Sequence, residues 1–192
     1  GISHQIISEL VRPGMLVAGS DSHTATAGAF NTLAVGINKT ETAVLWKTGK
    51  MWFQVPETVK IVLKNRLSEG VFAKDLALWI KGILSELDVN GQAIEYHGEG
   101  VSSLSIDDRM TIANISTEMG VISSAFPPDD RLADYFNEPA VRGVWADEEA
   151  VYSRFIEIDL ANVFPMVYDT GNNVLQAVEE LVGLKIQQGL IG

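Results

Sequence analysis

The 192-residue sequence contains no cysteine. This absence excludes a disulfide framework and any thiolate metal ligand from these residues, and it leaves the redox compartment unreadable. Positive charge is also scarce, because 14 lysines and arginines stand against 25 aspartates and glutamates, for a formal net charge of −11. Nucleic acids and anionic membrane surfaces both attract positive charge, so we expect neither as a partner.

Long apolar runs are missing as well. No stretch approaches the roughly 20 apolar residues that a membrane-spanning helix needs, so we expect no membrane span and a cytoplasmic location. The sequence also lacks a Gly-rich phosphate loop with lysine, a Gly-x-Ser-x-Gly elbow and a His-Glu-x-x-His pair. The hydrophobic fraction of 46% and the charged fraction of 20% are typical of a globular protein with a buried core.

Histidine is rare, but two of the three copies, His4 and His23, fall near the start of the chain. Residues 15–19 form an apolar run of strand type and residues 25–28 begin a helical stretch, so His23 follows the carboxyl end of a strand, where open α/β sheets place ligands. In an extended segment Asp21 and His23 would point the same way. Alternatively, Asp-Ser-His-Thr merely caps a helix at the surface. Spacing alone leaves both interpretations open.

A second candidate pair, Asn114 and Glu118, lies four positions apart on a predicted helix, so both side chains project from one face. They face either solvent or a polar pocket. His97 is flanked by glycine in a predicted loop, where a structural role is the simpler interpretation. A divalent metal on His4 and His23 has little support, because 18 residues separate them and no further ligand pattern follows.

Strands alternate with helices along the chain, which predicts an α/β fold with mainly parallel pairing. Ser105 and Asp108 have the spacing of a capping box. Besides 15–19, we expect strands at 58–67, 94–100, 155–159 and 183–192, helices at 33–46, 73–87, 105–119 and 172–181, weaker helices at 129–136 and 148–152, and a loop at 123–130.

Several segments, taken in order, resemble the aconitase superfamily, particularly the large subunits of the 3-isopropylmalate dehydratase and homoaconitase type. They cover essentially the whole chain, and the ordered set is far more specific than Asp-Ser-His-Thr alone. The segments are Gly1-Ile-Ser-His-Gln5, Val11-Arg-Pro-Gly-Met15, Gly19-Ser-Asp-Ser-His-Thr24, Thr48-Gly-Lys-Met-Trp-Phe-Gln-Val-Pro56, Ala73-Lys-Asp75, Ile94-Glu-Tyr-His-Gly98, Ala113-Asn-Ile-Ser-Thr-Glu-Met-Gly120 and Gly183-Leu-Lys-Ile-Gln-Gln188.

The resemblance implies three-layer α/β/α lobes with mainly parallel sheets. Residues 1–56 would end a first lobe, residues 57–152 would form a middle lobe, and residues 153–192 would start a third lobe that bears a cluster. The implied activity is a hydro-lyase that removes and re-adds water on a hydroxy di- or tricarboxylic acid, with a [4Fe–4S] cluster as Lewis acid.

The family's cluster cysteines and its serine base have no match among these residues. The resemblance therefore implies an internal fragment that holds no cluster and has no turnover by itself, with a swivelling domain or small subunit as partner. The alternative is a non-catalytic split subunit or pseudoenzyme module that binds a carboxylic acid or a partner chain.

Individual residues can also be carried over from the family. The resemblance pairs His4 with Asp21 and His23 with Glu118, whereas spacing alone pairs Asp21 with His23. Ser22 matches a serine that contacts a substrate carboxylate, and Asn114 matches an asparagine close to the cluster. The candidate catalytic residues are His4, Asp21, His23 and Glu118. Departures at Ser3 and at residues 25–27, where many dehydratases have cysteine, leave the substrate open.

Overall fold

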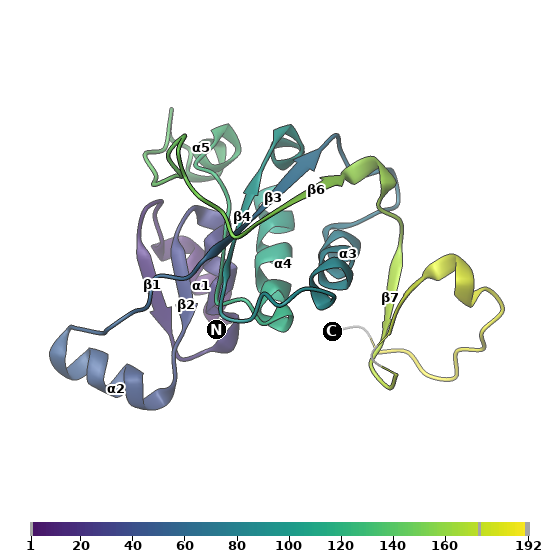
Figure 1. The fold of residues 1–192 in the computed structure, drawn as a ribbon, viewed down its shortest axis with the longest axis horizontal. Helices are drawn as coiled ribbons and strands as arrows, with labels where there is room; N and C mark the ends of the chain where they lie inside the picture. The colour runs from purple at the N-terminus through teal and green to yellow at the C-terminus, as the bar shows by residue number, and fades with distance from the viewer. Residues whose placement is uncertain (1, 173, 191–192) are drawn as a thin grey trace.

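A computed structural model describes residues 2–172 and 174–190. Its main sheet has four parallel strands in the order β5-β4-β3-β6 (Figure 1). This arrangement confirms the predicted α/β class with mainly parallel pairing. The strands are β3 (Thr58–Lys64), β4 (Ala93–His97), β5 (Ser123–Ala125) and β6 (Arg154–Asp159).

Helices α3 (Ala73–Ser85) and α4 (Ile106–Ser116) pack together against one face of this sheet. Strand β3 alternates buried and half-buried residues, and its Val59, Ile61 and Leu63 are fully buried. The apolar stripe expected at 73–87 and the alternation expected at 58–67 therefore meet in one core, as their periods predict.

A second, smaller layer lies on the other side of α4. It contains the parallel pair β1 (Leu16–Gly19) and β2 (Leu33–Gly36), the 3-10 helix η1 (Ser22–Phe30) that connects them, and α1 (Ser3–Leu10). Phe30 and Ile106 share a second apolar core that joins η1 to α4. This layer presents η1 to α4, and the site is built at that junction.

The helix expected at 33–46 is wrong over its first part. Residues Leu33–Gly36 form strand β2, and helix α2 runs from Lys39 to Thr48. Asn38 starts this helix, because its side chain accepts a hydrogen bond from the Glu41 N–H while the Glu41 carboxylate accepts one from the Asn38 N–H. This capping box overrides the helical spacing of the residues before it.

Other predictions fail at chain segments that take extended structure. The loop expected at 123–130 contains β5, which pairs with β4. The helix expected at 172–181 is replaced by the hairpin of β7 (Met166–Asp169) with β8 (Val174–Ala177) and by η5 (Val178–Leu181). Two further predictions fail without extended structure taking their place: no helix forms at 148–152, and the strand expected at 183–192 is absent over 183–190. Its last two residues, 191 and 192, lie outside the described part of the chain.

Helix α5 (Asp130–Phe136) and the capping box at Ser105 are confirmed. The remaining short 3-10 helices are η2 (Glu99–Ser103), η3 (Thr117–Met119) and η4 (Leu160–Asn162). No helix within 2–172 or 174–190 combines the length and apolarity that crossing a membrane requires. The division of the chain at residues 56 and 152 stays a prediction.

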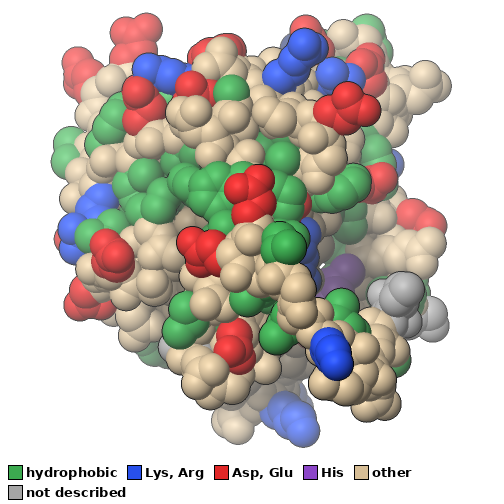
Figure 2. Space-filling model, turned by 90° about the vertical axis from the view of Figure 1, so that its right-hand side faces the viewer, with side chains coloured by type: hydrophobic (Ala, Val, Ile, Leu, Met, Phe, Trp, Pro, Cys, Tyr) green, Lys and Arg blue, Asp and Glu red, His purple; other side chains and the backbone are tan. Residues whose placement is uncertain are grey.

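The segment that follows β6 extends away from the main sheet (Figure 1). It leaves apolar side chains exposed, including Val182, Leu184, Ile186 and Leu190, each at least 70% accessible. Seen from this side, a band of hydrophobic side chains crosses the molecule between acidic groups (Figure 2). Exposed apolar surface of this extent is typical of a region that another part of a protein covers.

Candidate active site

The turn after β1 brings Asp21 and His23 to the start of η1. Asp21 caps this helix, because its Oδ1 accepts a hydrogen bond of 2.8 Å from the His23 N–H. Gly36 of the neighbouring strand permits this approach, since a Cβ there would lie 3.1 Å from the Asp21 carbonyl oxygen. The capping interpretation is therefore correct, although it does not exclude a second role for the carboxylate.

Asp21 lies between two imidazoles. Its Oδ1 is 3.4 Å from Nε2 of His4, which α1 carries, and 3.8 Å from Nδ1 of His23. On the far side of the His23 ring, Nε2 is 3.4 Å from Oε1 of Glu118. The four predicted residues thus form one continuous row, which we call the His4–Glu118 row. Both pairings of Asp21, the one from spacing and the one from the resemblance, occur together.

Helix α4 and η3 hold η1, which carries His23, in place. Asn114 donates a hydrogen bond of 2.9 Å from Nδ2 to the Thr26 hydroxyl of η1, and Thr117 donates one of 3.1 Å to the Ser22 carbonyl oxygen. These two bonds fix η1 against α4. The helix expected to reach 119 changes to 3-10 geometry after Ser116, so Glu118 belongs to η3.

The row is open to solvent on its acidic side. The side chains of His4 and His23 are 21% and 33% accessible, against 54% and 55% for Asp21 and Glu118. Separations of 3.4–3.8 Å exceed those of short hydrogen bonds, and catalytic contacts commonly tighten only when the substrate binds. The row can orient two rings and provide a counter-charge for an imidazolium.

Ser22 is exposed at the start of η1, with its Oγ 3.2 Å from Nδ1 of His23. Its hydroxyl is therefore placed beside the row, where a ligand could reach it. Thr26 was overlooked in the sequence, although its hydroxyl links His23 to Asn114 by donating to the His23 carbonyl oxygen. Its only sequence signal was its position three residues after His23.

The donor set does not fit an iron–sulfur cluster, because cluster irons take thiolate ligands and the sequence has no cysteine. Among residues 2–172 and 174–190, no three His, Asp or Glu side chains come together in a way that could hold a metal ion. The chemistry that these residues themselves offer is proton transfer and hydrogen bonding.

His97 lies elsewhere, in a polar group on the sheet face opposite α3 and α4. Its Nε2 is 3.2 Å from Oε2 of Glu95, which also accepts a 2.9 Å bond from the Tyr152 hydroxyl, and the Trp145 ring lies 4.9 Å from the imidazole. Hydrogen bonding to His97 and then to Tyr152 holds the pKa of Glu95 below its usual value. Burial and the Glu95 contact raise the pKa of Tyr152 to about 12.

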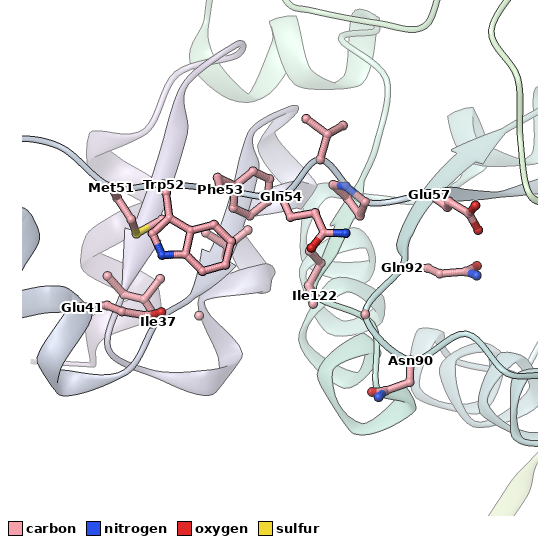
Figure 3. A pocket seen from close by; sticks show the side chains of 15 residues that line it. Ile37, Glu41, Met51, Trp52, Phe53, Gln54, Glu57, Asn90, Gln92 and Ile122 are labelled. Atoms are coloured by element: carbon pink, nitrogen blue, oxygen red, sulfur yellow. The ribbon is translucent and has the colours of Figure 1, made fainter.

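A hollow of about 570 Å³ separates α2 and the segment after it from the main sheet (Figure 3). Met51, Trp52 and Phe53 lie on one side of it, and Asn90 and Gln92 lie on the other. None of the predicted site residues lines this hollow. It offers no paired acid and base, so the His4–Glu118 row is the better candidate for chemistry.

Comparison with known proteins gives a consistent result. The aconitase family (aconitate hydratase) matches residues 1–180. The chain is 38% identical over its whole length to the 3-isopropylmalate dehydratase large subunit 1 of Thermotoga maritima and 39% identical to that of Methanopyrus kandleri, covering 48% and 47% of those proteins. The large subunit from Clostridium kluyveri is 38% identical, with 47% covered. The chain therefore spans about half the length of these relatives.

Proposed function

This chain belongs to the aconitase family, and we propose that within a larger protein it supplies proton-transfer groups to a hydro-lyase. The reaction would remove and re-add water on a hydroxy di- or tricarboxylic acid. The observation that supports the proposal is the His4–Glu118 row, in which every successive pair of side chains approaches within 3.8 Å. Two carboxylates alternating with two imidazoles suit the protonation of a leaving hydroxyl group.

The leaving hydroxyl must receive a proton before or as its bond to carbon breaks. Both ring nitrogens of His23 face protein groups, Glu118 on one side and Ser22 with Asp21 on the other. Within 2–172 and 174–190, His4 has one such partner, Asp21, which faces its Nε2. We therefore assign proton donation to Nδ1 of His4, with Asp21 orienting the ring and facing the imidazolium.

His23 and Glu118 then act behind this pair. Glu118 holds the His23 ring against Asp21, and the charge of Asp21 is shared between the two rings. In the hydration direction the same His4 nitrogen would take back the proton from the attacking water, as reversibility requires.

The rest of the machinery would come from outside these 192 residues. We propose that three cysteines elsewhere in the whole protein bind the [4Fe–4S] cluster and that a swivelling domain or small subunit brings the base that removes the carbon-bound proton. Because several relatives are named 3-isopropylmalate dehydratase large subunits, 3-isopropylmalate is the first substrate to assay. We propose a cytoplasmic location.

The substitution Glu118→Gln in the whole protein tests the proposal. It keeps the size of the side chain and one oxygen acceptor but removes the charge that faces Nε2 of His23. We expect the dehydration rate to fall about 10²-fold, the range of acid–base and charge-stabilising groups. Glu138→Gln, an exposed glutamate beyond α5, is the matched control and should retain the parent rate.

A dehydration rate within twofold of the parent for Glu118→Gln would remove the row from the mechanism. A whole protein that binds hydroxy acids but never turns them over, even with its cluster present, would instead favour the non-catalytic module. The two results are distinct, because the first requires an active parent enzyme.

A further inference from the structure

A small hollow adjoins the His4 end of the row. It has a volume of about 280 Å³ and lies among α1, η1, the first turn of α3 and the exposed side of α4. Its polar lining residues are His4, Thr26, Lys74, Thr111 and Asn114. Since a water molecule takes up about 30 Å³ of the liquid, this volume equals that of roughly nine waters, which is enough for a small organic acid.

Lys74 is the one lysine or arginine that lines this hollow. Its side chain is exposed, and within 2–172 and 174–190 it forms no ion pair or side-chain hydrogen bond. The adjacent carboxylate cannot serve it well, because Asp75 is committed through Oδ2 to the Phe72 N–H and through Oδ1 to the Met166 N–H, each at 2.9 Å. The ammonium group is therefore free to meet an anion.

The position of Lys74 is unfavourable for the helix that carries it. Lys74 is the second residue of α3, where the positive end of the helix dipole disfavours a cation and favours an acid such as Asp75. Local helix stability therefore does not explain a lysine here. Lys39 has a similar position in α2, so it is the hollow beside His4, and not the helix position, that distinguishes Lys74.

The hydrogen bonds around the hollow leave only a few donors for a ligand. The Thr26 hydroxyl donates to the His23 carbonyl oxygen and the Thr111 hydroxyl donates to that of Asp107. Asn114 uses one amide hydrogen on Thr26, so its second one remains available. Within the described part of the chain, the free side-chain donors at the hollow are this amide hydrogen, the Lys74 ammonium and Nδ1 of His4, a set suited to a carboxylate next to a hydroxyl group.

We propose that Lys74 binds a carboxylate of the substrate, with help from Asn114, and so holds the adjacent hydroxyl group against His4. The proposal rests on the hydro-lyase function above and adds a specificity-determining residue to it. It also answers an electrostatic need. The row contributes two carboxylates, which repel a polyanionic substrate, and Lys74 offsets this repulsion on the side where the hollow lies.

The test compares three variants of the whole protein. Lys74→Met removes the charge and keeps the apolar stem, and Lys74→Arg keeps the charge. Lys39→Met is the matched control, because Lys39 is also an exposed lysine in the first turn of a helix, α2, but lines no part of the hollow. The kinetic substrate is 3-isopropylmalate. The binding probe is 2-isopropylsuccinate, the same dicarboxylate without the hydroxyl group, measured by titration calorimetry.

For Lys74→Met we expect both KM and the Kd of the probe to rise about 10- to 100-fold, the effect of losing a hydrogen bond between charged groups. We expect kcat to change less than threefold, because the contact exists in the ground state and in the transition state alike. Lys74→Arg should recover most of the binding, and Lys39→Met should match the parent.

The inference is overturned if Lys74→Met leaves KM and the Kd of the probe within twofold of the parent values, whether or not kcat falls. Failure of the proposed function has a different signature. A parent protein that binds the probe through Lys74 but shows no turnover would refute the hydro-lyase function and still support the carboxylate site. A parent that neither binds nor reacts overturns both.

Discussion

Gly28 of η1 is the residue whose replacement best tests how the site is held together. A Cβ at this position would lie 1.5 Å from the carbonyl oxygen of Ser124 and 2.7 Å from its carbonyl carbon. The same contact includes a hydrogen bond of 3.1 Å from the Phe126 N–H to the Gly28 carbonyl oxygen. Helix η1, which carries His23, thus packs directly on the backbone of β5 and of Phe126 after it.

The substitution Gly28→Ala forces this backbone apart, because a carbonyl oxygen in a sheet cannot rotate away as a side chain would. Restoring an ordinary contact would need a shift of about 2 Å between η1 and β5. We expect a cost of about 3 kcal/mol, at the upper end of overpacking effects. Up to about 1 kcal/mol is offset because alanine restricts the unfolded chain more than glycine does.

The assay is thermal unfolding of the whole protein. A net loss of about 2 kcal/mol should lower the melting temperature by about 4–8 °C for a cooperative folding unit of about 150–250 residues. Glu138→Gln, the exposed substitution beyond α5, is again the control and should match the parent. Dehydration activity of Gly28→Ala should also fall, because η1 carries Ser22 and His23. A melting temperature within 1 °C of the parent would refute the reasoning.

Two further predictions concern charged groups away from the row. The fully buried Arg109 makes two hydrogen bonds to Asp129. Asp129→Ala should therefore lower the unfolding free energy measured in urea by about 3–5 kcal/mol, because a buried cation loses its partner. Adding Arg109→Leu should recover part of that loss, and fully additive effects of the two substitutions would contradict the coupling. Because the pKa of Glu95 is lowered in the folded protein, ionised Glu95 stabilises the fold above the usual carboxyl range, and this stabilisation is lost as the pH falls through the lowered pKa. The difference in unfolding free energy between the parent and Glu95→Gln should therefore shrink from pH 6 to pH 3. A difference that stays constant over this range would contradict the prediction.

The sequence predicted the main sheet well because its signals are local. The alternation at 58–67 and the helical stripe at 73–87 reflect burial on a single face. Such a pattern can be read from the sequence without knowing which elements pack against that face. The errors arose where a partner strand or turn decided the structure. Residues 123–125 are extended because β4 pairs with them. Residues 174–177 are extended because the turn at Asp169 returns them antiparallel to β7.

The candidate site could be predicted only in part for the same reason. Spacing identified the Asp21–His23 pair, which is local, and the helix cap, which is also local. The contact of His23 with Glu118 spans 95 positions and depends on η1 packing against α4, so only the family resemblance could suggest it. Lys74 falls in a segment of the family resemblance, but only the hollow beside His4 indicates that it could bind a ligand.

A single carboxylate shared by two imidazoles has a consequence for how the row can work. Asp21 uses one oxygen, Oδ1, for its helix cap, for His4 and for His23, so it cannot make short contacts with all three at once. In the proposed reaction, a protonated His4 would draw the charge of Asp21 toward itself, and His23 would then depend on Glu118 as its partner. Under this proposal, Glu118 would hold the His23 ring in place while His4 exchanges its proton with the substrate.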